Sequence, residues 1–168
     1  AENPMYCEAL GSERDGACAE FCWVSSAQLY DVSDAPLSDT EIGAMPCAFG
    51  TALNLLARAG VAEGDQVLIT GGSGGVGLAA AQLARQRGAR VTAVSAKTKA
   101  DAVLEAGAEQ VIGRDEWPPQ DQFSVVIDVV GGSAFSSLLD ALRPGGRLAT
   151  SGAIAGPVVS TDLRTVYL

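Results

Sequence analysis

An apolar run gives way to a glycine cluster and then to an alanine-rich segment in the stretch VLITGGSGGVGLAA, from Val67 to Ala80. Within this stretch, Gly72, Gly74 and Gly77 form a G-x-G-x-x-G pattern. Glycine has no Cβ atom, so it suits a tight turn and a close approach between two backbone segments. The stretch therefore predicts a short buried strand, a tight turn and a helix that packs closely on the strand.

Four more apolar runs alternate with helical segments further along the chain. We expect strands at residues 66–70, 90–95, 109–112, 124–130 and 146–152, and helices at 77–88, 99–107 and 133–146. The strand runs are apolar on both faces, as in parallel strands that helices cover on both sides. The sequence therefore predicts an α/β fold with a doubly wound parallel sheet, and it leaves an α+β domain with a mixed sheet as the alternative.

The segment before the first strand also predicts helix. Apolar residues at helical spacing indicate one helix within residues 37–60, or two with a break near Pro46, which suits a helix start as Gly60 suits a helix end. Residues 1–38 contain short strand-like pieces such as AEFCWV (19–24) and no independent domain. The chain begins without Met and ends in TVYL, which looks like the start of a strand, so we expect a fragment of a longer protein.

Composition argues against two classes of partner. The formal net charge is −9 at pH 7, which disfavours nucleic acid because phosphate binding needs a basic surface. No apolar run is long enough to span a membrane, and the N-terminus lacks the basic and apolar parts of a signal peptide. We therefore expect a cytoplasmic protein with neither a nucleic acid nor a membrane as its partner.

The side chains also limit the chemistry of the chain. The sequence has no histidine, which excludes Ser-His and Cys-His catalysis and histidine-ligated metal within these residues. The spacing of the cysteines does not fit a zinc knuckle, so we expect reduced thiols and no metal site. These cysteines are Cys7, Cys18, Cys22 and Cys47.

The glycine turn has the form of a dinucleotide site. Its first glycine would make the tight turn, its second would let the backbone approach a pyrophosphate, and its third would let helix and strand pack closely. The helix start would offer unpaired backbone N–H groups and the positive end of its dipole to the phosphates. A turn without a ligand is the alternative. A phosphate loop of the NTPase type is excluded because no Gly-Lys-Ser/Thr sequence follows.

The residues after the expected second strand favour NADP over NAD. An NAD site carries an acidic residue about 20 positions after the glycines, whereas an NADP site carries a cation for the 2′-phosphate. Here the segment reads SAKTK, with Ser95, Lys97 and Lys99, and no acidic residue lies between Asp65 and Asp101. A solvated helix start is the alternative role for Lys97. The sequence therefore predicts NADP, with NAD as the less favoured cofactor.

Several stretches together resemble the cofactor domain of the medium-chain dehydrogenase/reductase superfamily, and most of all its quinone oxidoreductase-like branch. They are GACAEFCWVSSAQLYDVSD…MPCAFGTALNLL, GDQVLITGGSGGVGLAAAQLARQRGARVTAVS and GAEQVI…FSVVIDVVGGSAFSSLLDALRPGGRLATSG. The resemblance implies a dinucleotide-binding Rossmann fold for residues 39–168, truncated at its C-terminal end. It makes residues 1–38 the tail of an N-terminal GroES-like catalytic domain, with its linker.

The resemblance also implies a set of cofactor-binding residues. Residues 74–77 would border the pyrophosphate, and Ser95 and Lys97 would meet the adenosine phosphate. The residues after the fourth strand would lie against adenosine, those after the fifth would lie near the nicotinamide, and Thr51 would approach the cofactor from the preceding helix. The full set is Thr51, Gly72, Ser73, Gly74, Gly75, Val76, Gly77, Ser95, Lys97, Val130, Gly131, Ser151, Gly152 and Ala153. No catalytic residue is identified.

The function implied by the resemblance is NADPH-dependent hydride transfer to a small-molecule substrate, either a quinone or an activated C=C or carbonyl compound. Family members are longer and have a preceding catalytic domain, so we expect the isolated chain to be inactive and the longer protein to form a homodimer. The Gly-His-Glu motif of zinc-dependent members is not in this chain, which leaves zinc in the longer protein open. The alternatives are a zinc-dependent alcohol dehydrogenase, a nucleotide-binding or sensor module, and an enoyl-reducing domain of a larger synthase.

Overall fold

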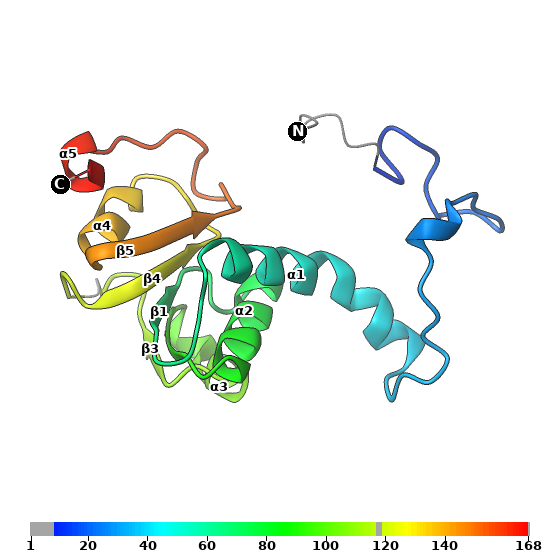
Figure 1. Cartoon of the computed structure of the whole chain (residues 1–168), viewed down its shortest axis with the longest axis horizontal. Helices are drawn as coiled ribbons and strands as arrows, with labels where there is room; N and C mark the ends of the chain where they lie inside the picture. The colour runs from blue at the N-terminus through cyan, green and yellow to red at the C-terminus, as the bar shows by residue number, and fades with distance from the viewer. Residues whose placement is uncertain (1–8, 117–118, 168) are drawn as a thin grey trace. The chain divides into compact units, whose positions relative to one another are not determined.

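The computed structural model describes residues 9–116 and 119–167, which divide into two units between Ser38 and Asp39. The second unit contains a five-stranded sheet in the order β3-β2-β1-β4-β5, and every neighbouring pair of its strands is parallel (Figure 1). The predicted α/β fold with a parallel sheet is therefore confirmed, and the mixed-sheet alternative is wrong. The strands are β1 (Gln66–Ile69), β2 (Arg90–Val94), β3 (Gln110–Ile112), β4 (Phe123–Asp128) and β5 (Leu142–Thr150).

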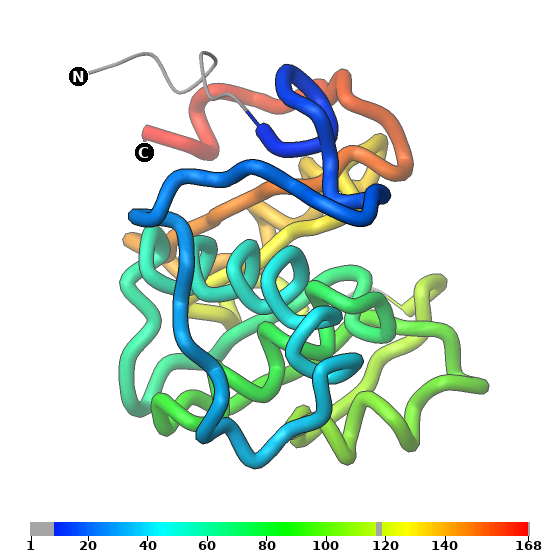
Figure 2. Tube along the Cα trace, turned by 90° about the vertical axis from the view of Figure 1, so that its right-hand side faces the viewer, coloured from blue at the N-terminus to red at the C-terminus, as the bar shows by residue number. Residues whose placement is uncertain are grey.

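Helices cover both faces of this sheet. On one face, Val67 and Ile69 of β1 pack in a cluster with α1, α2 and α3, and Figure 2 shows α1 and α2 side by side. On the other face, Leu68 packs with Leu138 of α4. Successive residues of a strand point to opposite faces, so a strand between two helical layers must be apolar throughout. The helices are α1 (Asp39–Arg58), α2 (Gly75–Gln86), α3 (Ala100–Glu105), α4 (Phe135–Asp140) and α5 (Leu163–Tyr167).

Helix α1 is a single helix that contains Pro46. The prediction of one helix is therefore confirmed, and the alternative of two helices with a break at Pro46 is wrong. A proline inside a helix cannot donate to the carbonyl four residues earlier. Pro46 is exposed, and Ile42, whose carbonyl lacks this helical donor, is half-buried. Gly60 has a φ of +60° just beyond the last helical residue, and a left-handed glycine there ends the helix as predicted.

The helix expected over residues 133–146 is only partly correct. Helix α4 ends at Asp140, and β5 already begins at Leu142. The pairing of β5 with β4 shifts its register between Leu142 and Arg147, a segment that contains one proline and two glycines. Both residue types are tolerated in an edge strand at such an irregularity. Because the irregular segment breaks the strand pattern, the sequence does not reveal where β5 begins.

The short pieces expected as strands near the two ends of the chain are wrong. The piece AEFCWV (19–24) has no regular secondary structure, and its Phe21 and Trp23 side chains are exposed. In the final piece TVYL, residues 165–167 belong to α5, and Leu168 lies outside the described residues. β-propensity depends on packing against neighbours, and neither piece pairs with a strand among residues 9–116 and 119–167.

A buried carboxylate connects three strands at the amino edge of the sheet. Asp65, just before β1, accepts hydrogen bonds from the Arg147 guanidinium of β5 at 2.8 and 2.9 Å and from the Ser124 hydroxyl of β4 at 2.7 Å. It also accepts one from the Ala62 N–H at 2.9 Å. Burial raises the pKa of the Asp65 carboxyl, but these hydrogen bonds outweigh burial and hold its pKa below the usual value. The ionised carboxylate therefore stabilises the fold.

The substitution Asp65→Asn is expected to lower the free energy of unfolding by about 1–2 kcal/mol at pH 7. A folded-state pKa below the unfolded value of about 3.9 gives stability that is fully present above the unfolded pKa. That stability is lost as the pH falls through the folded pKa. Urea denaturation over a series of pH values from neutral into acid should show a gap in stability between the two proteins that narrows as the pH falls below the unfolded pKa. A gap of constant size would mean that the carboxylate charge contributes nothing.

Candidate cofactor site

The glycine turn lies at the carboxyl edge of the sheet, between β1 and α2. The Gly72 N–H donates to the Val94 carbonyl at the end of β2 (2.9 Å), and the Gly74 N–H donates to the Gly71 carbonyl (2.9 Å). The chain continues from β1 to β2 and β3 on one side and returns to β4 on the other side of β1. Parallel α/β sheets bind their ligands outside the carboxyl ends of the strands at such a reversal.

Three glycines are required by the packing of the turn itself. A Cβ atom on Gly77 would lie 2.3 Å from the Gly71 carbonyl oxygen and 2.8 Å from the Gly72 Cα. One on Gly72 would lie 2.8 Å from the Ala93 Cβ. Gly71 has a φ of +61°, which disfavours any residue with a side chain. The close approach of α2 to the end of β1 therefore accounts for the first and third glycines of the pattern without a ligand.

Gly74 and Gly75 differ from these because an added Cβ atom would meet a slightly tight contact at Gly74 and an ordinary contact at Gly75. They are exposed, whereas Gly72 and Gly77 are buried. A Cβ atom on Gly74 would be 3.3 Å from the Gly71 carbonyl oxygen, and one on Gly75 would be 3.5 Å from the Ala48 Cβ. A serine or aspartate would cap α2 better than Gly74, and alanine would favour the helix over Gly75 by about 1 kcal/mol. A turn without a ligand leaves both glycines unexplained.

The start of α2 presents backbone donors at this edge. The Leu78 N–H donates to the carbonyl of Gly74, the N-cap residue, at 2.9 Å and is the first N–H with an acceptor in the helix. The N–H groups of residues 75–77 come before it and have no acceptor within the helix. The first turn contains no acidic side chain, and the positive end of the helix dipole lies here. Together with the exposed glycines, these groups fit the pyrophosphate of a dinucleotide.

The remaining residues of the turn and the neighbouring helix are half-buried. They are Ser73, Val76 and Thr51. Thr51 lies on α1 three residues after Ala48, whose Cβ is the atom closest to the unfilled Cβ position of Gly75. Helix α1 therefore passes the start of α2 (Figure 2). The role of Thr51 beside the cofactor stays a prediction.

The loops after β4 and β5 pack on each other through their backbones. The Ala155 N–H donates to the Val130 carbonyl (2.9 Å). A Cβ atom on Gly152 would lie 2.0 Å from the Val129 carbonyl oxygen, and Gly131 has a φ of +65°. Contact between the two loops therefore requires both glycines. The cofactor contacts expected of residues 130–131 and 151–153 stay predictions.

Ser95 and Lys97 follow β2, beside the glycine turn. Ser95 is buried, and its N–H donates to the Ile112 carbonyl at 3.0 Å. Lys97 begins the 3-10 helix η3 (Lys97–Lys99), and its side chain is 75% exposed. The structure therefore brings the Lys97 ammonium, but not the Ser95 side chain, to the surface at this edge.

A carboxylate that the sequence interpretation missed faces Lys97. Glu116, in the loop after β3, forms an ion pair with the Lys97 ammonium and accepts a hydrogen bond from the Gly113 N–H at 3.1 Å. The hydrogen bond from Lys97 and then that from Gly113 lower the pKa of Glu116, and the bond to Glu116 raises the pKa of Lys97. The interpretation of Lys97 as a cation without acidic neighbours is wrong, because β3 brings a distant segment alongside β2.

A second missed residue is Asp128, at the end of β4. Its carboxylate has no exposed surface and accepts hydrogen bonds from the hydroxyls of Thr70 (2.6 Å) and Thr150 (3.0 Å). The sequence did contain a signal for this residue, because the apolar run SVVIDVV has a single acidic residue. A carboxylate buried in such a run needs hydrogen-bond partners, which could have singled out Asp128.

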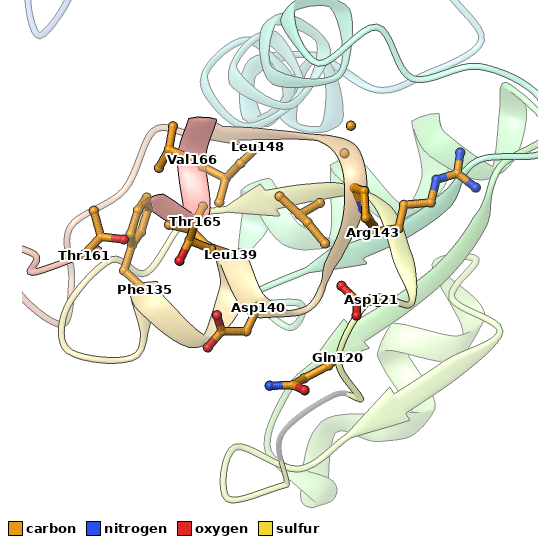
Figure 3. A pocket seen from close by; sticks show the side chains of 14 residues that line it. Gln120, Asp121, Phe135, Leu139, Asp140, Arg143, Leu148, Thr161, Thr165 and Val166 are labelled. Carbon is orange, nitrogen blue, oxygen red and sulfur yellow. The ribbon is translucent and has the colours of Figure 1, made fainter. Parts of the chain in front are cut away.

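A hollow of about 660 Å³ lies elsewhere, among α4, β5 and α5 (Figure 3). Phe135, Leu139 and Val166 line it together with Asp140 and Arg143. No predicted cofactor-binding residue lines this hollow. It is therefore separate from the glycine turn.

The cysteines and the acidic residues form no metal centre in the part of the chain that the structure describes. Cys18, Cys22 and Cys47 are free and exposed, and Cys7 lies outside the described residues. Within residues 9–116 and 119–167, no group of three or more His, Cys, Asp or Glu side chains could hold a metal ion. In the same ranges, no helix has both the length and the apolar character needed to cross a membrane.

A parallel sheet with a glycine turn at its strand-order reversal defines a Rossmann-like nucleotide-binding domain. A sequence model of the zinc-binding dehydrogenase family matches residues 75–168. The chain therefore belongs to this family of medium-chain dehydrogenase/reductase oxidoreductases, as its resemblance predicted. A nicotinamide cofactor is typical of the family.

Similar proteins cover almost the whole chain. The acryloyl-coenzyme A reductase of Metallosphaera sedula is 35% identical over an alignment 170 residues long, which covers 96% of this chain and 50% of that protein. The structure of a putative alcohol dehydrogenase from Sinorhizobium meliloti 1021 is 42% identical, with a TM-score of 0.87 over 95% of this chain and 46% of that one. The yhdH oxidoreductase of Salmonella enterica, in complex with NADP, is 30% identical, with a TM-score of 0.71 over 80% of this chain and 44% of that one.

Other relatives bear the name quinone oxidoreductase. The chain spans about half the length of the curated relatives that it matches over more than nine-tenths of its own length.

Proposed function

We propose that this chain is the cofactor-binding domain of an NADPH-dependent oxidoreductase that transfers a hydride to a quinone or to an activated C=C or carbonyl group. The observation that carries the proposal is the pair of exposed glycines, Gly74 and Gly75, at the start of α2. A side chain would fit at Gly75 and would need only a small backbone shift at Gly74, and the adjoining N–H groups have no acceptor inside the helix. A bound pyrophosphate accounts for both features.

The part of this chain in the reaction is to bind and orient the cofactor. A nicotinamide, when bound, supplies the hydride chemistry. The N–H groups of residues 75–77 hold the pyrophosphate, and the loops after β4 and β5 form the edge along which the rest of the dinucleotide lies. Fixing the reacting ring in one orientation lowers the entropic cost of reaching the transition state.

The position of Lys97 supports NADPH over NADH. Its ammonium is exposed after β2, where dinucleotide-binding folds recognise the ribose 2′-position. No acidic residue lies between Asp65 and Asp101, and the Salmonella relative was solved with NADP. Glu116 opposes this preference because its carboxylate already pairs with Lys97. Binding of NADPH would therefore exchange Glu116 for the 2′-phosphate as the partner of Lys97.

Lys97→Ala is expected to raise the Kd for NADPH about tenfold and to leave the Kd for NADH within about twofold, because only NADPH carries the 2′-phosphate. Glu116→Gln is expected to lower the Kd for NADPH about two- to fivefold, because it removes a competing charge at constant size. Fluorescence titration with each nucleotide at fixed salt measures both effects.

Lys99→Ala is the matched control for this pair, because it removes the same charge from the other end of η3. It should change neither Kd by more than about twofold. Equal losses for NADPH and NADH in the Lys97→Ala protein would show a solvated lysine with no part in cofactor selection.

The proposed activity is tested by steady-state oxidation of NADPH in the full-length protein that contains this chain. A benzoquinone and an α,β-unsaturated thioester are suitable acceptors, because relatives are named for quinones and for acryloyl-coenzyme A. Turnover with either acceptor supports the oxidoreductase and identifies its substrate class. Tight binding of NADPH without turnover on any acceptor would instead favour a nucleotide-binding or sensor module.

A zinc-dependent alcohol dehydrogenase is the second candidate, and the name of the matched family favours it. The residues of this chain do not fit a zinc site, since the sequence has no histidine and the described ranges contain no metal-binding group. Zinc-dependent oxidation of an alcohol by the full-length protein would show that its substrate is an alcohol and not a quinone or an enoyl compound.

The proposal also covers the location and the partners of the protein. We expect a cytoplasmic protein that acts on a small molecule and forms a homodimer in its longer form. The net charge of −9 supports a partner other than nucleic acid.

A further inference from the structure

A buried carboxylate lies at the cofactor edge and takes no part in the steps described above. Asp128 is the last residue of β4, next to β1 at the reversal of strand order, and its side chain is 0% exposed. Burial of a carboxylate is costly unless hydrogen bonds compensate for the lost water. The hydrogen-bond partners of Asp128 therefore indicate its role.

The Asp128 carboxylate accepts hydrogen bonds from three segments. Oδ1 accepts from the Thr70 hydroxyl at 2.6 Å and from the N–H groups of Val130 and Gly131 at 3.1 and 3.3 Å. Oδ2 accepts from the Thr150 hydroxyl at 3.0 Å and from the Gly131 N–H at 3.1 Å. Thr70 leads into the glycine turn, Val130 and Gly131 follow β4, and Thr150 leads into the loop after β5. One side chain therefore bonds three of the segments that form the proposed cofactor edge.

We propose that Asp128 is a positioning residue, which holds these three segments in the arrangement that binds the nucleotide. This inference rests on the proposed function. Asp128 does not touch the nucleotide, since its side chain is fully buried and its carboxylate oxygens bond the chain itself. If only core stability were needed, an apolar residue would serve as well, because a packed apolar group is often as stabilising as a buried charge. A carboxylate adds directional bonds to backbone N–H groups.

The first test compares Asp128→Asn, Thr150→Val and the protein with both changes. The asparagine keeps the size of the side chain but replaces one acceptor oxygen with a donor. Each single change is expected to raise the Kd for NADPH about tenfold, with a cooperative thermal transition retained. The effect of Thr150→Val should largely disappear in the Asp128→Asn background, because the hydroxyl acts through the carboxylate.

Conservative variants provide the controls. Thr150→Ser keeps the hydroxyl and is expected to bind NADPH within about twofold of the wild type. Thr92→Val makes the same change on β2, away from Asp128, and should also leave the Kd unchanged. If Asp128→Asn does not fold, the pair Thr70→Val and Thr70→Ser repeats the comparison from β1, since the Thr70 hydroxyl donates to the same carboxylate.

The results distinguish a failure of the proposed function from a failure of the role proposed for Asp128. A wild-type chain that binds neither NADPH nor NADH would overturn the proposed function and this inference together. A folded Asp128→Asn protein with an unchanged Kd would overturn the inference alone. Fully additive effects of Asp128→Asn and Thr150→Val would also overturn it, because Thr150 would then act on the nucleotide directly.

Discussion

Gly77→Ala is expected to lower the free energy of unfolding by about 3 kcal/mol or more, the largest effect on stability that the site predicts. The added Cβ atom would lie 2.3 Å from the Gly71 carbonyl oxygen and 2.8 Å from the Gly72 Cα. Both are backbone atoms in a tightly packed turn, so they cannot move without shifting α2 away from β1. Urea denaturation followed by circular dichroism measures the loss.

Gly75→Ala is the matched control, because it adds the same methyl group to the same helix. Its Cβ atom would lie 3.5 Å from the Ala48 Cβ, an ordinary contact, and alanine favours the helix by about 1 kcal/mol. The control should therefore be as stable as the wild type or more stable. A Gly77→Ala protein that matched its stability would contradict the close approach between turn and helix.

Gly74→Val is expected to weaken nucleotide binding at least about a hundredfold while the chain stays folded. Gly74 has a φ of −82° and a ψ of 165°, an extended conformation that valine adopts readily. Its added Cβ atom would be 3.3 Å from the Gly71 carbonyl oxygen, which a small shift can relieve. The valine side chain would occupy the exposed space in front of α2, where the pyrophosphate is proposed to bind.

The control for Gly74→Val is Gly43→Val on α1, where an added Cβ atom would meet nothing within 4 Å. Both proteins should show the thermal transition of a folded chain, and only the Gly74 variant should lose nucleotide binding. Retained binding in a folded Gly74→Val protein would leave the turn with a structural role only.

The core of the fold could be predicted because the residue types indicate which segments are buried. The runs that became β1 and β4 are apolar at successive positions, which only a strand covered on both faces requires. The start of β5 could not be predicted, because its register shift removes the regular pattern. The AEFCWV piece resembles a strand in composition, but strand formation needs a neighbouring strand that the sequence does not specify.

The candidate site could be predicted only where its residues are close in sequence. The glycine turn is local, so its position between β1 and α2 followed from the pattern. The pairing of Lys97 with Glu116 depends on the order of β2 and β3 in the sheet. The packing requires glycine at Gly77 but not at Gly74. This difference depends on distances across the turn, which the sequence does not give.

The most direct test of the proposed nucleotide site is a side-by-side titration of this chain with NADPH and NADH, followed by nucleotide fluorescence at several salt concentrations. The structure predicts that both nucleotides bind through the start of α2, and that NADPH binds more tightly by an amount that shrinks as salt is added. Binding of neither nucleotide to the folded chain would contradict the assignment of the glycine turn as a dinucleotide site.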